Sequence, residues 1–80
     1  MTKQQLENIL REFPGVDSNQ VRVVGNGPFV AEIVVAGFDG IDEADRQERV
    51  YEFLRSRFPD DEMQNIEFII TNAPGDAAAE

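Results

Sequence analysis

The apolar residues near the start of the chain recur with helical spacing. They fall on one side of a helix predicted over residues 2–12 and at its end: Leu6, Ile9, Leu10 and Phe13. Thr2 suits the N-cap position, and Gln5 stands where a capping box places its second polar residue. Pro14 and Gly15 then end the helix.

Alternation of apolar and polar residues next predicts a pair of strands. The first covers residues 20–25 and the second covers residues 29–36, with the turn-forming sequence GNGP between them. The two strands should therefore form a β-hairpin. The pattern leaves the register open, including whether Arg22 lies opposite Glu32.

A longer amphipathic pattern predicts a second helix over residues 43–57. Asp42 suits its N-cap, acidic residues follow in the first turn where the helix dipole favours them, and Pro59 ends it. One stripe of this helix should pack on the sheet: Gln47, Val50, Tyr51, Leu54 and Phe58.

A third strand is predicted over residues 66–71, after a polar loop. Simple alternation would put Ile66, Phe68 and Ile70 on one face. Residues 73–80 offer only alanine for burial, so we expect a disordered C-terminal tail.

These elements predict an α+β domain with the order α-β-β-α-β. A long helix between the second and third strands is a crossover connection, which makes those strands parallel. We therefore expect a two-layer sandwich in which a three-stranded mixed sheet carries both helices on one face.

Composition limits the chemistry of the chain. Its 80 residues fit one domain with a single modest core, and it contains neither Cys nor His. Disulfides, thiol nucleophiles, imidazole catalysis and the usual zinc ligands are thereby excluded. Because no apolar run could span a membrane and the start lacks the order of a secretory signal, we expect a cytoplasmic protein.

The balance of charge is strongly acidic. Sixteen acidic residues against seven basic ones give a formal net charge of −9, and such a field repels phosphate backbones. Nucleic acid is therefore not the partner that the composition favours. The same acidity would also suit a salty cytoplasm, and the sequence does not separate the two explanations.

Two loop motifs near residue 40 invite functional hypotheses. As a calcium loop beginning at Asp39, the sequence would have Ile41 at a ligand position and Ala44 where glycine is required, so we expect the acids only to begin a helix. GFDG also fits the G-x-x-G loop with which K homology domains approach RNA. Here it joins a strand to a helix and carries an acid, so we expect Gly37 and Gly40 merely to permit the turn.

A second stripe of the long helix combines cations with an aromatic residue: Arg46, Arg49, Phe53 and Arg57. One interpretation is a solvated surface on which Asp42 pairs with Arg46 and Asp45 with Arg49. The other is a protein-docking face, since arginine and aromatic residues are enriched at interface hot spots. No spacing among the acids singles out a catalytic carboxylate pair.

Six residues in this region resemble the signature of the BolA-like family. That signature has an aromatic residue opening the second strand, then F-x-G, an arginine and a Val-Tyr pair; here these are Phe29, Phe38, Gly40, Arg46, Val50 and Tyr51. The order of elements is also similar. The resemblance implies one non-enzymatic domain over residues 1–72, related to the type II K homology topology, with residues 73–80 as the tail.

The resemblance also implies partners. BolA-like proteins bind monothiol glutaredoxins, with which some share a [2Fe–2S] cluster, and others are described as transcriptional regulators in stress response. At the position of the family's cluster-binding histidine, this chain has Glu67. A carboxylate is a harder ligand than imidazole, so we expect no shared cluster and no other cofactor. The family's C-terminal helix is replaced by the predicted tail.

The sequence thus predicts a protein-interaction domain, monomeric or weakly dimeric, with a monothiol glutaredoxin as the partner that the resemblance implies. The predicted partner-binding residues are Arg46, Arg49, Phe53, Arg57 and Glu67. Two alternatives remain open. One is a K homology-like transcriptional regulator that binds nucleic acid, and the other is a metal-dependent or carboxylate enzyme, which would need two acids converging in a pocket.

Overall fold

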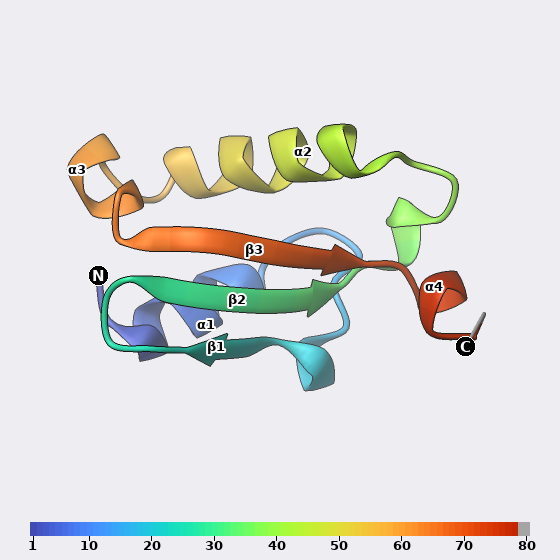
Figure 1. Cartoon of the computed structure of the whole chain (residues 1–80), viewed down its shortest axis with the longest axis horizontal. Coiled ribbons are helices and arrows are strands. Elements are labelled where there is room, and N and C mark those ends of the chain that lie inside the picture. The colour runs from blue at the N-terminus through green and yellow to red at the C-terminus, as the bar shows by residue number, and fades with distance from the viewer. Residues whose placement is uncertain (79–80) are drawn as a thin grey trace.

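Three strands form one sheet in the order β1-β2-β3 (Figure 1). β1 (Arg22–Val24) pairs antiparallel with β2 (Phe29–Val34), and β2 pairs parallel with β3 (Ile66–Asn72). This computed structural model describes residues 1–78. The predicted mixed sheet is confirmed, and the hairpin register does place Arg22 opposite Glu32.

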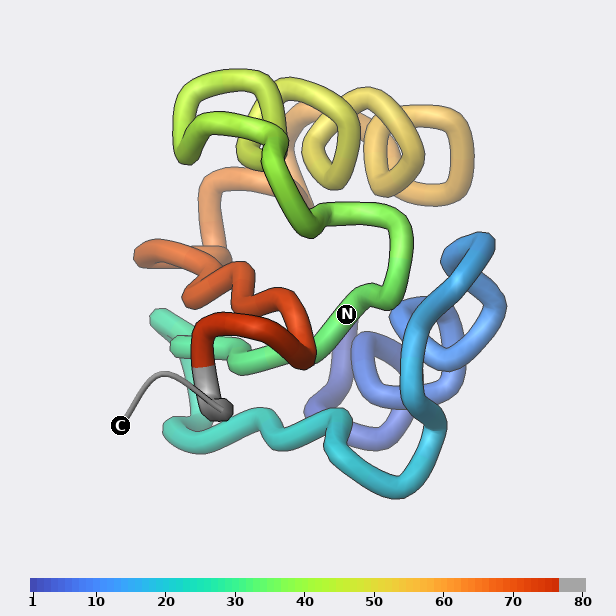
Figure 2. The backbone as a smooth tube through the Cα atoms, turned by 90° about the vertical axis from the view of Figure 1, so that its right-hand side faces the viewer, coloured from blue at the N-terminus to red at the C-terminus, as the bar shows by residue number. Residues whose placement is uncertain are grey.

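Two helices of different length pack against this sheet. α1 (Lys3–Leu10) begins with the predicted capping box, and α2 (Glu43–Arg55) begins at Asp42, whose carboxylate accepts a hydrogen bond of 2.9 Å from the N–H of Asp45. In Figure 2, turned by 90°, α1 lies beside the sheet and α2 lies across its upper end. Both helices belong to the same layer, as predicted.

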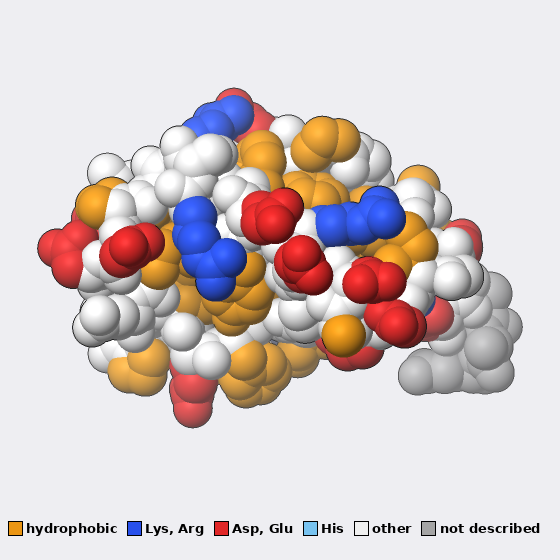
Figure 3. Space-filling model, turned by 90° about the horizontal axis from the view of Figure 1, so that it is seen from above, with side chains coloured by type: hydrophobic (Ala, Val, Ile, Leu, Met, Phe, Trp, Pro, Cys, Tyr) orange, Lys and Arg blue, Asp and Glu red, His pale blue; other side chains and the backbone are white. Residues whose placement is uncertain are grey.

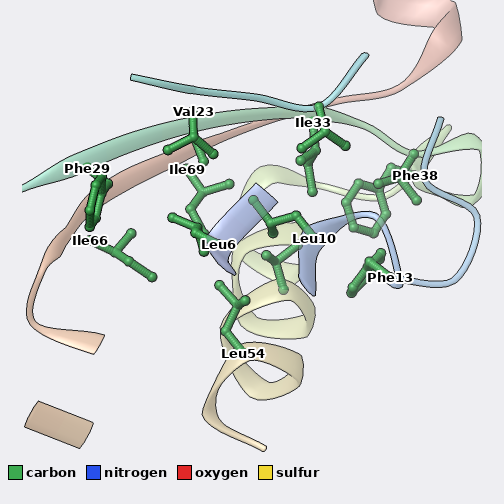
Figure 4. Close-up of a cluster of buried hydrophobic side chains, with 14 of the residues drawn as sticks. Leu6, Leu10, Phe13, Val23, Phe29, Ile33, Phe38, Leu54, Ile66 and Ile69 are labelled. Atoms are coloured by element: carbon green, nitrogen blue, oxygen red, sulfur yellow. The ribbon is translucent and has the colours of Figure 1, made fainter. Parts of the chain in front are cut away.

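The core lies between the sheet and the helices. In Figure 4, Val23, Ile33 and Ile69 point from the strands toward the helical side chains of Leu6, Leu10 and Leu54. Both leucines of α1 and Leu54 are completely buried. The apolar stripes of the two helices therefore pack where their spacing predicted, although Gln47, Tyr51 and Phe58 of the α2 stripe are only half-buried.

The third strand differs from the prediction because it contains a bulge. Ile66 pairs with Phe29 and Phe68 pairs with Val30, which leaves Glu67 as an extra residue in β3. Beyond the bulge the alternation is inverted: Ile69 is 1% exposed, whereas Phe68 is 48% and Ile70 is 38% exposed. The prediction that Ile66, Phe68 and Ile70 share one face is therefore wrong.

Short helical turns occupy several segments that were predicted as strand or loop. η1 (Ser18–Gln20) precedes β1, η2 (Ala36–Phe38) follows β2, and α3 (Asp60–Met63) fills the loop before β3. The second strand consequently ends at Val34 rather than at residue 36. α3 follows Pro59, and its acidic first turn suits the dipole of a helix N-terminus.

The structure also corrects the prediction of a disordered C-terminal tail. Residues 73–78 are ordered: Ala73 is completely buried and α4 (Pro74–Ala78) follows β3 directly. Asp76 accepts hydrogen bonds from the N–H of Ala73 and from Arg46, so a polar contact holds a segment that lacks large apolar side chains. The rest of the predicted tail, residues 79–80, lies outside the described part of the chain.

Candidate functional site

Arg46 lies inside the protein, not on a docking surface. Its side chain is 10% exposed. Its Nε donates to the carbonyl oxygen of Ile41 at 2.7 Å, and its Nη1 donates to the carbonyl oxygen of Thr71 at 3.1 Å and to Asp76 at 2.8 Å. Arg46 therefore ties the start of α2 to the end of β3 and to α4, which corrects its assignment to the partner-binding set.

Polar side chains of α2 also cover part of the outer edge of β3. Gln47 donates to the carbonyl oxygen of Ile69 at 2.6 Å, and the hydroxyl of Thr71 donates to Glu43 at 2.8 Å. An unpaired strand edge invites pairing with another chain. Gln47 and Arg46 thus occupy two backbone acceptors on this stretch of β3, and Glu43 binds a side chain there, so the interactions of α2 with β3 are structural.

The contact between Arg46 and Asp76 predicts a pH dependence. The hydrogen bond from Arg46 and the N–H of Ala73 lower the pKa of the Asp76 carboxyl below its ordinary value. A carboxyl whose folded pKa is depressed stabilises the fold above its unfolded pKa of about 4 and loses that contribution as pH falls. We expect the melting temperature of the wild type to fall more between about pH 5 and pH 2 than that of Asp76→Asn.

Thermal melts followed by circular dichroism at several pH values would measure this difference. Asp60→Asn is a matched control, because Asp60 is exposed and has no ion pair or side-chain hydrogen bond within residues 1–78. A melting curve of Asp76→Asn with the full acid dependence of the wild type would show that the contact does not contribute to stability.

Arg49 is a predicted site residue that remains available to a partner. It is exposed, and its side chain forms no ion pair and no hydrogen bond within residues 1–78; the expected pairs of Asp45 with Arg49 and of Asp42 with Arg46 are both absent from that range. Arg49 borders a surface pocket of about 260 Å³. We call this the Arg49 pocket, and its lining residues are Phe13, Pro14, Val35, Gly37, Phe38 and Arg49.

Phe53, in α2, and Arg57, just after it, contact residues of the loop that follows α1. The ring of half-buried Phe53 meets that of Phe13 edge-on, with the centroids 5.3 Å apart. The Arg57 guanidinium lies 5.1 Å from the Phe53 ring centroid and pairs with Glu12 at 3.0 Å. Phe53 thus adjoins the Arg49 pocket through Phe13, one of its lining residues.

Glu67 is not joined to this surface by any described contact. It is the extra residue of the β3 bulge, its side chain is exposed, and it has no ion pair or side-chain hydrogen bond within residues 1–78. The five predicted residues thus divide into one internal arginine, three residues on α2 or just after its end, and a separate acid on β3.

The pocket itself was missed by sequence reasoning. Its aromatic floor combines Phe13 with Phe38, whose ring centroids are 5.7 Å apart. A bridge between Val16 and Val35 and a hydrogen bond from the N–H of Ala36 to the carbonyl oxygen of Gly15 bring the two loops together. The sequence signal was a Phe within two positions of a glycine in each loop, at FPG and at GF.

The two loop motifs have structural explanations. Asp39 of GFDG accepts a hydrogen bond of 3.2 Å from the N–H of Gly75, and Gly40 has a φ of +79° that suits the turn into α2. Asp42 caps α2. In the part of the chain that the structure describes, no three acidic side chains converge to form a metal site.

The surface around α2 has mixed charge. Figure 3, which views the molecule from above α2, shows basic side chains separated by acidic and apolar ones rather than gathered in one patch. A nucleic acid would require a continuous basic footprint. Within residues 1–78, no helix has the length and apolarity to cross a bilayer.

Comparison with known proteins adds no assignment. The chain matches no protein-family model, and no significant match was found among curated proteins or among solved structures. The BolA-like resemblance consequently rests on the six signature residues and the order of elements alone. Five of them have structural roles here: Phe29, Phe38, Arg46 and Val50 are buried, and Gly40 permits the turn into α2.

Proposed function

We propose that the chain is a BolA-like, non-enzymatic protein-interaction domain whose partner docks at the Arg49 pocket. The observation that carries the proposal is an exposed arginine, without a side-chain partner among residues 1–78, beside a pocket lined by two phenylalanines. Interfaces concentrate their binding energy in such arginine and aromatic positions.

The charge of the pocket suggests what a partner would supply. A carboxylate from the partner can form two parallel hydrogen bonds with the Arg49 guanidinium, while an adjacent apolar side chain packs over Phe13 and Phe38 in the pocket. At longer range, the net charge of −9 favours a partner that is basic or has a basic surface. The pocket therefore favours a local acid within a surface that is not acidic overall.

The BolA-like resemblance suggests a monothiol glutaredoxin as this partner, in iron–sulfur or stress-response pathways. Glu67, at the position of the family's histidine, is exposed and lies on β3 rather than at the Arg49 pocket. A carboxylate there would add negative charge beside the thiolates of a shared cluster. We therefore propose an interaction of the two proteins that does not depend on a [2Fe–2S] cluster.

Binding of a monothiol glutaredoxin, measured by isothermal titration calorimetry without iron or sulfide, tests this proposal. We expect Arg49→Glu to weaken binding by about tenfold or more, because loss of a hot-spot residue costs at least 1–2 kcal/mol, and tenfold corresponds to about 1.4 kcal/mol. Arg55→Glu is the matched control, since it makes the same charge change on α2 outside the pocket.

The two variants separate a local effect from a general one. Arg55→Glu should change the affinity by less than about threefold, which is roughly the effect of one screened surface charge. An equal loss in both variants would indicate long-range electrostatics and contradict docking at the pocket. Absence of binding by the wild-type chain would rule out the glutaredoxin as partner.

A further inference from the structure

The sheet face opposite the helices is uncovered among residues 1–78. In Figure 1, α1 lies behind the strands and no element lies in front of them. The three exposed large hydrophobic side chains of the described residues are Val24, Phe68 and Ile70, with exposures of 52%, 48% and 38%. All three point to this side of the sheet.

The strand register arranges this face in two rows. One row is apolar and crosses the sheet from Val24 through Val30 to Phe68; the other runs from Arg22 through Glu32 to Ile70. Arg22 and Glu32 lie 4.0 Å apart, so the second row carries one charge of each sign. We call the surface made by these two rows the open face.

A hollow and a projecting ring lie side by side on the open face. The hollow, of about 210 Å³, is lined by Arg22, Val24, Val30, Ala31, Glu32 and Ile70. Phe68 is not part of its lining and stands next to it at the end of the apolar row. For comparison, an apolar cavity of about 150 Å³ is large enough to bind benzene.

We propose that the open face is a self-association surface, on which two copies of the chain form a two-fold symmetric dimer. In such a dimer the Phe68 ring of each copy enters the hollow of the other, and Arg22 of each copy faces Glu32 of the other. A second copy fits this face because the projecting ring and the hollow, and the cation and the anion, are both present on one surface. A two-fold axis then makes every contact twice.

The size of the face predicts a weak dimer. Three strands about 4.8 Å apart, with two rows that span about four residues at about 3.3 Å each, give a face of roughly 200 Å² per copy. Two such faces bury well below the ~1,200 Å² of a standard stable interface. Each copy also carries a charge of −9, so screening by salt should strengthen the association.

Sedimentation equilibrium of the full chain tests the proposal over protein concentrations from about 10 μM to 1 mM, a range suited to the weak affinity of small interfaces. We expect the average mass to rise toward that of a dimer with concentration, and to rise further at about 1 M salt than at about 0.05 M, because the Debye length falls several-fold. Phe68→Ser should remain monomeric throughout. Glu52→Ser, exposed on α2, should dimerise as the wild type does or slightly better.

A charge exchange tests the two-fold arrangement itself. Arg22→Glu places two acids opposite each other in the dimer and should weaken dimerisation, while Arg22→Glu combined with Glu32→Arg should restore it. All of these residues are at least partly exposed, and unchanged melting temperatures would show that each variant folds. A wild-type chain that stays monomeric at 1 mM in both salts, or a Phe68→Ser variant that dimerises normally, overturns the proposal and leaves the face to a different protein.

Discussion

Ile69→Ala is expected to lower the free energy of unfolding by about 2–5 kcal/mol, whereas Phe68→Ala should lower it by about 1 kcal/mol or less. Ile69 is completely packed between the sheet and α2, so truncation leaves a cavity that the neighbouring side chains cannot fill. Phe68 is larger but half-exposed on the other side of the sheet. Urea denaturation followed by circular dichroism would measure both changes.

This comparison tests the bulge at Glu67. Without the bulge, regular alternation would bury Phe68 and expose Ile69, and the order of the two effects would be reversed. Ile70→Ala serves as a second surface control, because it makes the same chemical change as Ile69→Ala at a position with 38% exposure. A larger loss for Phe68→Ala than for Ile69→Ala would contradict the described register of β3.

Arg46→Met is expected to lower the melting temperature by roughly 10 °C, although methionine retains an unbranched apolar chain similar to the aliphatic part of arginine. The substitution removes the donors for the carbonyl oxygens of Ile41 and Thr71 and the contact that holds α4. Arg46→Lys should recover only part of this loss, because one ammonium group cannot reach all three acceptors in the geometry of a guanidinium.

Arg49→Met is the matched control for this change. It makes the same chemical change on the same helix, but the Arg49 side chain is exposed and makes no hydrogen bond within residues 1–78. The melting temperature of Arg49→Met should therefore differ from that of the wild type by no more than about 2 °C. Thermal melts at neutral pH would distinguish the two. Equal melting temperatures for the two variants would mean that the buried network of Arg46 does not stabilise the fold.

Local patterns were sufficient to predict the main elements. The capping box of α1, the Asp42 cap of α2 and the apolar stripes of both helices depend on residues within a few positions of one another. The mixed sheet followed from the crossover helix. Each of these features depends on the spacing of residues along the chain, which can be read directly from the sequence.

The features that were missed depend on contacts between distant residues. The bulge at Glu67 results from how β3 pairs with β2, and periodicity within residues 66–71 cannot reveal it. Arg46 is buried because its partners Thr71 and Asp76, 25 and 30 residues further on, converge on it. The same contacts order α4, whose residues taken alone have little to bury.

The candidate site was also predicted only in part: its residues on the long helix were found, and the pocket beside them was not. Arg49 and Phe53 share one side of α2, as helical spacing predicts, whereas Arg57 lies just beyond the end of the helix and contacts the Phe53 ring. The pocket beside them could not be read from the helix, since Phe13 and Phe38 come from two loops that meet only in the folded chain. The sequence did not reveal that Glu67 lies away from this surface, because its location depends on how β3 pairs in the sheet.

Amide chemical-shift changes in the isotope-labelled protein, recorded during titration with a monothiol glutaredoxin, test most directly whether a partner docks at the Arg49 pocket. We expect the largest changes at Gly37, Phe38, Arg49 and Phe53, with residues of the open face such as Val24 and Ile70 unaffected. Changes confined to the open face, or no changes at a glutaredoxin concentration above that of the labelled protein, would contradict the proposed docking site.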